Sequence, residues 1–113
     1  MKALLFFLGL LLTSVSINAQ QSIDGIWNTG KENTTIEIKK VEGKIYSSDN
    51  AKATKGKLMI KDLEKTGNSY KGKLYLIRKN TWVDAEFVPN GNFLNVTVSA
   101  GFQSKTLTWS KVN

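Results

Sequence analysis

Two carboxylates, Asp84 and Glu86, have the residue type and the spacing that could support acid–base chemistry. Residues i and i+2 of a strand share a face, which places these two groups roughly 7 Å apart, and paired carboxylates about 5–9 Å apart can hydrolyse glycosidic bonds. The residues between and beside them, Val83, Ala85 and Phe87, are apolar and claim the buried face. We therefore expect Asp84 and Glu86 to point to solvent and to pair with lysines of neighbouring strands.

Other catalytic chemistry is restricted by composition, because the chain has no histidine and no cysteine. That excludes Ser-His-Asp triads, cysteine nucleophiles, and zinc or haem sites built on those ligands. A Ca²⁺ site at Asp49 and Asn50 would need more carboxylates nearby than the sequence supplies. We expect a protein that is not an enzyme, with no catalytic residues, no metal site and no cofactor.

The first 19 residues have the features of a secretory signal. Lys2 precedes the apolar run Ala3–Leu12, and the polar segment Ser14–Ala19 ends in a small residue. Residues 20–113 are enough for a single domain, and they contain no apolar run near the roughly 20 residues that a membrane helix needs. We expect an exported protein without a membrane span, located in the periplasm or outside the cell.

Positive charge is concentrated in the middle of the chain, which has a formal net charge of +7. Residues 39–79 contain 12 basic and 4 acidic side chains. Such a segment could bind an anionic component of the cell envelope. Alternatively, its lysines keep a small sheet soluble and protect the strand edges. Nucleic acid is not an expected partner of an exported protein.

The elements that position these residues are short segments in which apolar and polar side chains alternate. This period of two is typical of antiparallel strands with one buried face, and short turns rich in Gly and Asn separate the segments. We expect about eight strands in an antiparallel meander closed into a small β-barrel, with a β-sandwich as the alternative. The expected strands are Ile23–Asn28, Thr34–Lys39, Lys44–Ser47, Leu58–Lys61, Tyr70–Arg78, Trp82–Val88, Phe93–Ser99 and Lys105–Lys111.

The alternation also predicts which side chains fill the barrel. An eight-stranded barrel has room for packed side chains or one small ligand. We expect a small apolar cavity that opens at the end away from Trp27. The predicted interior residues are Trp27, Ile36, Ile38, Ile45, Leu58, Ile60, Leu74, Leu76, Val83, Phe87, Leu94, Val96, Val98, Leu107, Trp109 and Ile26.

The first and last expected strands contain a pattern that resembles a known group of β-barrels. Gly25-Ile26-Trp27 resembles the Gly-x-Trp opening of lipocalins and related calycin barrels, in which the tryptophan closes one barrel end and a basic residue of the last strand packs over it. Lys111, on the same face as Trp109, could take that place through a cation–π contact.

A second resemblance covers most of residues 20–113. The segments that carry it are Gly25–Trp27, Gly56–Leu63, Tyr70–Tyr75, Leu94–Val98 and Lys105–Val112. In these segments the chain is similar to a family of small exported bacterial proteins known only as a domain of unknown function. Its members begin with Gly-x-Trp and end in a Thr-x-Trp-x-Arg/Lys-Val strand. The resemblance implies a calycin-like small barrel and brings no established activity.

Two functions follow as hypotheses. The first is non-enzymatic binding of a small apolar or amphipathic ligand, such as a lipid or fatty acid, inside the barrel. Its candidate residues are Trp27, Leu76, Val96, Trp109 and Lys111. The second is a cell-envelope interaction module that binds a protein or an anionic glycan through its basic outer face. Its candidate residues are Lys71, Lys73, Tyr75 and Trp82.

Overall fold

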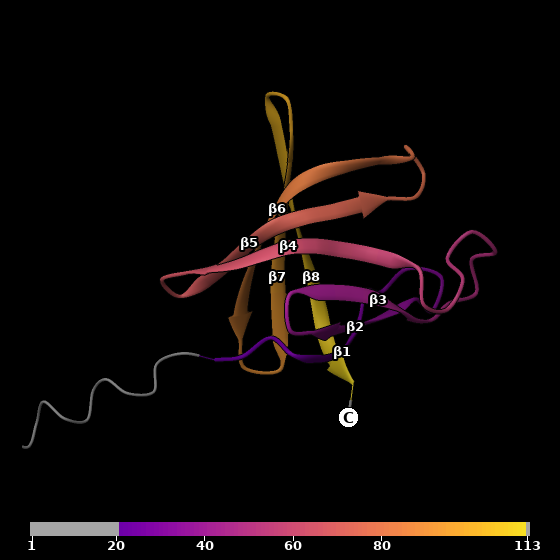
Figure 1. Ribbon diagram of the computed structural model, residues 1–113, viewed down its shortest axis with the longest axis horizontal. Coiled ribbons are helices and arrows are strands. Elements are labelled where there is room, and N and C mark those ends of the chain that lie inside the picture. The colour runs from indigo at the N-terminus through magenta and orange to yellow at the C-terminus, as the bar shows by residue number, and fades with distance from the viewer. Residues whose placement is uncertain (1–20, 113) are drawn as a thin grey trace, which may run out of the picture.

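A computed structural model describes residues 21–112 of the chain (Figure 1), so the expected signal segment lies outside the described residues. The described part is all-β and contains no helix. Its eight strands are β1 (Gly25–Asn28), β2 (Thr35–Lys39), β3 (Glu42–Ser47), β4 (Leu58–Thr66), β5 (Ser69–Leu76), β6 (Thr81–Asn90), β7 (Phe93–Ala100) and β8 (Gln103–Val112).

The strands form a closed barrel in chain order. Each strand pairs antiparallel with the next, and β1 pairs with β8 through Ile26–Val112, Trp27–Lys111 and Asn28–Ser110. Closure leaves no edge strand exposed. The predicted antiparallel meander barrel is therefore confirmed, and the sandwich alternative is not the structure observed.

The core follows the predicted alternation in most strands. Trp27, Phe87, Leu94 and Val96 are fully buried, and Trp109 lies beside Phe87 with 6.2 Å between the ring centroids. The prediction for Ile26 is wrong, since this residue is only partly buried and alternates with the inward Trp27.

The alternation of β4 also differs from the prediction, which paired Leu58 with Ile60 on the inside. The register between β3 and β4 shifts at Gly43, so that Leu58 lies opposite the exposed Lys44 and is only partly buried. Met59 and Ile60 are both buried instead. A bulge inserts one residue into the period of two, which simple alternation cannot anticipate.

Candidate functional site

The two ends of the barrel differ, and each is defined here by its residues. The closed end holds Ile23, Trp27 and Lys111, together with the β2–β3, β4–β5 and β6–β7 turns. The open end holds the β1–β2, β5–β6 and β7–β8 turns and the segment 48–57 between β3 and β4. A cavity of about 400 Å³ opens at the open end, which is the end that the sequence predicts. Its volume lies in the range of small-molecule sites, about 300–1,000 Å³.

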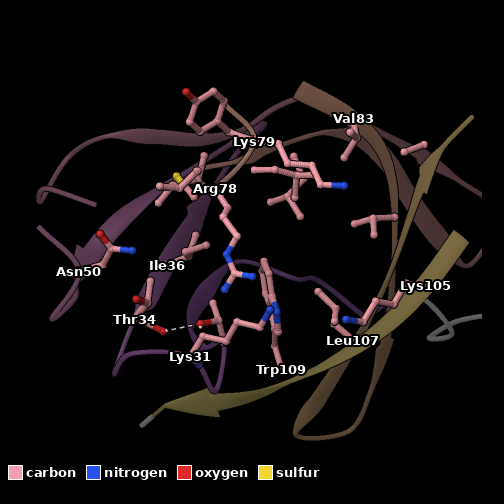
Figure 2. Close-up of a pocket in the computed structure, with 18 of the residues that line it drawn as sticks. Lys31, Thr34, Ile36, Asn50, Arg78, Lys79, Val83, Lys105, Leu107 and Trp109 are labelled. Atoms are coloured by element: carbon pink, nitrogen blue, oxygen red, sulfur yellow. Dashed lines mark hydrogen bonds between the residues drawn. The ribbon is translucent and has the colours of Figure 1, made fainter. Parts of the chain in front are cut away.

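Apolar side chains from several strands form the wall of this cavity (Figure 2). They come from the inward-facing rows of neighbouring strands, so the same alternation that builds the core also builds the cavity wall. Several are only partly buried, because they border space instead of other side chains. The apolar lining residues include Ile36, Met59, Leu74, Leu76, Val83, Val98, Leu107 and Trp109.

The rim of the cavity is basic. Four basic residues line it, Lys31, Arg78, Lys79 and Lys105, against one acidic residue, Glu32. The carboxylate of Glu32 also accepts a 2.9 Å hydrogen bond from the side chain of Asn50. The electrostatic field at the mouth of the cavity therefore favours an anionic group.

Arg78 extends from the rim into the cavity toward Trp109 (Figure 2). It lies in the β5–β6 turn, where Lys79 N–H donates to the carbonyl of Leu76 at 3.2 Å and Asn80 adopts a left-handed φ of 53°. Within residues 21–112, no side chain forms an ion pair or hydrogen bond with the Arg78 guanidinium. An unpaired guanidinium can bind a carboxylate or phosphate through two parallel hydrogen bonds.

Trp109 adds a second donor at the inner part of the cavity. Its ring is almost completely buried and lines the cavity. No described residue accepts a hydrogen bond from its indole N–H. Buried indole N–H groups usually have a partner, so this donor is available to a bound molecule.

The closed end is tied shut by contacts around Trp27. The indole N–H of Trp27 donates to the carbonyl of Ile23 at 2.9 Å. The ammonium of Lys111 lies 5.0 Å from the centroid of the Trp27 ring and donates to the carbonyl of Asp24 at 3.3 Å. The cation–π contact predicted between Lys111 and Trp27 is therefore present.

Gly25 provides the space for this lysine. Its φ is +140°, a conformation that residues with a side chain rarely adopt. A Cβ at this position would lie 2.9 Å from both Cε and Nζ of Lys111. The Gly-x-Trp pattern and the terminal lysine thus act together in closing this end.

The ligand-binding candidates from the sequence divide between the two ends. Leu76 and Trp109 line the cavity. Trp27 and Val96 are completely buried in the core, and Lys111 covers Trp27, so none of these three residues lines the cavity.

The surface candidates lie on β5 and β6, and one of them, Tyr75, also borders the cavity. Tyr75 and Trp82 are neighbours, with ring centroids 5.2 Å apart in an edge-to-face arrangement. Lysines cover both rings, with the Lys57 ammonium 4.8 Å from the Tyr75 centroid and the Lys61 ammonium 4.3 Å from the Trp82 centroid. The aromatic pair is therefore capped by cations and does not form a bare platform.

The two lysines among these candidates lie opposite carboxylates. Lys73 forms an ion pair with Asp84, and Lys71 is exposed opposite Glu86 in the strand register. The carboxyl of Glu86 accepts a 2.8 Å hydrogen bond from the Ser69 hydroxyl. Asp84 thus pairs with a lysine of the neighbouring strand, as predicted, whereas the side-chain partner of Glu86 is a serine.

Arg78 and Lys105 line the cavity but were not among the predicted site residues. The signal was present, because a period of two carries the inward row of Leu74 and Leu76 on to Arg78. The same period places Lys105 in the row of Leu107 and Trp109, and Lys105 lies opposite the inward Val98 in the register. Both are terminal residues of expected strands, Tyr70–Arg78 and Lys105–Lys111, but neither was assigned to the cavity.

No family model, curated protein or solved structure matches this chain. Among residues 21–112, no group of three or more acidic, histidine or cysteine side chains could hold a metal ion. The same residues include no helix with the length and apolar character needed to cross a membrane.

Proposed function

We propose that this protein binds an amphipathic anion, with the apolar part of the ligand inside the barrel and its anionic group on Arg78. A fatty acid has this chemistry. The observation that carries the proposal is the unpaired Arg78 guanidinium directed into an apolar cavity. Arg78 is exposed at the rim, so a neutral apolar ligand would gain no attraction from its guanidinium. A purely polar ligand would leave the apolar wall of the cavity in contact with water.

The rest of the cavity supports the same ligand class. Its aliphatic wall can bury a hydrocarbon chain, which contributes about 0.8 kcal/mol for each methylene group removed from water. Lys31, Lys79 and Lys105 surround the mouth and favour the approach of an anion. We propose that this binding takes place in the periplasm or outside the cell, which the features of a secretory signal and the resemblance to small exported proteins support.

Calorimetric titration with laurate tests the proposal, with dodecanol as a probe of equal chain length and no charge. We expect laurate to bind and dodecanol to bind more weakly. Arg78→Gln should weaken laurate about tenfold, the size of a lost charge-assisted hydrogen bond, and should leave dodecanol unchanged. Leu76→Trp should fill the cavity and abolish the binding of both molecules.

The control is Lys71→Gln, which removes a positive charge from the outer face. This variant should bind laurate like the wild type. If laurate binds equally well to Leu76→Trp, or if Lys71→Gln weakens it as much as Arg78→Gln does, the ligand does not lie in the cavity. That result would favour the alternative function, an interaction module that uses the basic outer face.

A further inference from the structure

Phe102 is the most exposed large apolar side chain among the described residues, with a relative exposure of 107%. It lies in the turn between β7 and β8, and this hairpin projects beyond the rest of the barrel at the top of Figure 1. Phe87 is fully buried and Phe93 is half exposed. Phe102 therefore stands alone at a protruding tip, where no side chain of the described chain covers it.

The tip belongs to the open end. Ala100 and Gln103, on either side of the turn, both line the cavity. The basic rim surrounds the same mouth, and Figure 2 shows Arg78, Lys79 and Lys105 around it. One insertable aromatic side chain and a cluster of cations thus occupy one end of the molecule.

We propose that the open end is a docking surface for an anionic lipid bilayer, with Phe102 entering the interface and the basic rim contacting the headgroups. A single exposed aromatic is ordinary on a protein surface, and a few lysines alone bind an anionic leaflet weakly. Attachment to a bilayer is stronger when an inserted apolar group and a basic cluster act together than when either acts alone. Both are present here within one barrel end.

A bilayer fits this surface better than a protein partner does. A protein interface needs a contiguous apolar centre with well-packed pockets. At the open end the aliphatic side chains line the cavity, and lysines cover the rings of Tyr46, Tyr75 and Trp82. Phe102 is the one aromatic ring of this end, among the described residues, that protrudes without such a cover. A fluid anionic surface can take up such a ring and the surrounding cations without a matching shape.

The docking proposal goes beyond ligand binding and stands independently of it. Docking in this orientation would turn the cavity mouth toward the membrane, where amphipathic anions reside. It needs no bound ligand, however, so the surface can be tested with vesicles alone.

Cosedimentation with vesicles tests the surface, using phosphatidylcholine with and without phosphatidylglycerol. We expect binding only to vesicles that contain phosphatidylglycerol, and we expect that binding to weaken at high salt. Phe102→Ala should weaken the partition coefficient roughly tenfold. The double change Lys79→Glu and Lys105→Glu should weaken it by more than tenfold, since each basic residue near an anionic surface contributes roughly fivefold.

Matched controls lie at the closed end. Phe93→Ala removes the other exposed phenylalanine, and the double change Lys39→Glu and Lys65→Glu alters net charge by the same amount as the rim variant. Both should keep most of the binding. Equal losses in the closed-end and open-end variants would show attraction by net charge alone and would overturn the proposal.

Insertion can be followed with a single label, because the chain has no cysteine. A polarity-sensitive fluorophore on Phe102→Cys should brighten and shift to the blue with anionic vesicles. The same label on Asn90→Cys, in an exposed position at the closed end, should not change. A fluorescence change at Asn90→Cys and none at Phe102→Cys would show that the closed end contacts the membrane, which would overturn the proposal.

One further variant separates docking from ligand binding. Leu76→Trp, which fills the cavity, should bind anionic vesicles like the wild type. If this variant loses vesicle binding, the vesicles supply a cavity ligand and the docking surface does not exist as proposed. A failure of laurate binding with intact vesicle binding would remove the proposed function and leave the docking surface standing.

Discussion

Strand β8 carries a lysine near each end of one inward row, and the two lysines have opposite surroundings. Lys111 covers Trp27 and donates to a backbone carbonyl at the closed end. Lys105 borders the cavity at the open end. Between them, Leu107 and Trp109 occupy the same row. The same strand, with an unbroken alternation of side chains, therefore contributes to both the closed end and the open end.

The two ends differ in the side chains that other strands place beside this inward row of β8. At the closed end, large side chains from several strands meet, and the segment before β1 adds Ile23. At the open end, partly buried aliphatic residues face one another across a cavity. Close packing stabilises a protein, and side chains that border a cavity make fewer van der Waals contacts. We infer that the closed end supplies the stability that the open end gives up for binding.

The largest expected effect is the loss of Trp27. Trp27→Ala should lower the free energy of unfolding by about 3–5 kcal/mol, because the ring is completely buried and its indole N–H bonds to Ile23. Urea denaturation followed by circular dichroism measures this change. A cost below about 1 kcal/mol would mean that the closed end is not the stable part of the barrel.

A leucine at each end gives a matched comparison of intermediate size. Leu94→Ala should cost about 3 kcal/mol, because it leaves a hole in a filled core. Leu76→Ala should cost about 1 kcal/mol, because its side chain is only partly buried and already borders a cavity. Equal costs in urea denaturation would contradict the contrast between a filled end and a hollow end.

Substitutions of the two lysines of β8 should have the smallest effects, and each should change only one property, stability or laurate affinity. Lys111→Met should lower stability by about 0.5–1 kcal/mol, the size of an exposed cation–π contact, and should leave laurate affinity unchanged. Lys105→Met should leave stability unchanged and weaken laurate a few-fold, since it removes one cation from the rim. Thermal denaturation and calorimetric titration of both variants provide the two measurements, and an exchange of these effects would reverse the assignment of the ends.

Much of the fold follows from the sequence because the alternation is regular. Antiparallel pairing and barrel closure were predicted from rows such as Leu94, Val96 and Val98. The direction of the open end was predicted from the position of Trp27. The irregular strand was not predicted. The register of β4 shifts against β3 at Gly43, and it shifts against β5 between Lys61 and Glu64. These shifts break the period of two, and local side-chain types do not reveal a bulge.

The site was predicted less completely than the fold. Leu76 and Trp109 follow from the inward rows, whereas Trp27 and Val96 look equivalent to them in sequence and lie in the filled end. Which part of a row is hollow depends on side chains from other strands, so it is a property of the assembled barrel. Arg78 ends the expected strand Tyr70–Arg78, but charged residues are usually solvated, and only the structure shows its side chain entering the cavity.

The most direct test of the account is a ¹⁵N-correlated NMR titration with laurate that follows the indole signals. The chain has three tryptophans, and they report on three places: Trp27 at the closed end, Trp109 in the cavity and Trp82 on the outer face. We predict that laurate shifts the Trp109 indole signal and leaves those of Trp27 and Trp82 unchanged. A shift of Trp82 alone, or no shift in any of the three, would contradict an account in which the open end of the barrel binds an amphipathic anion.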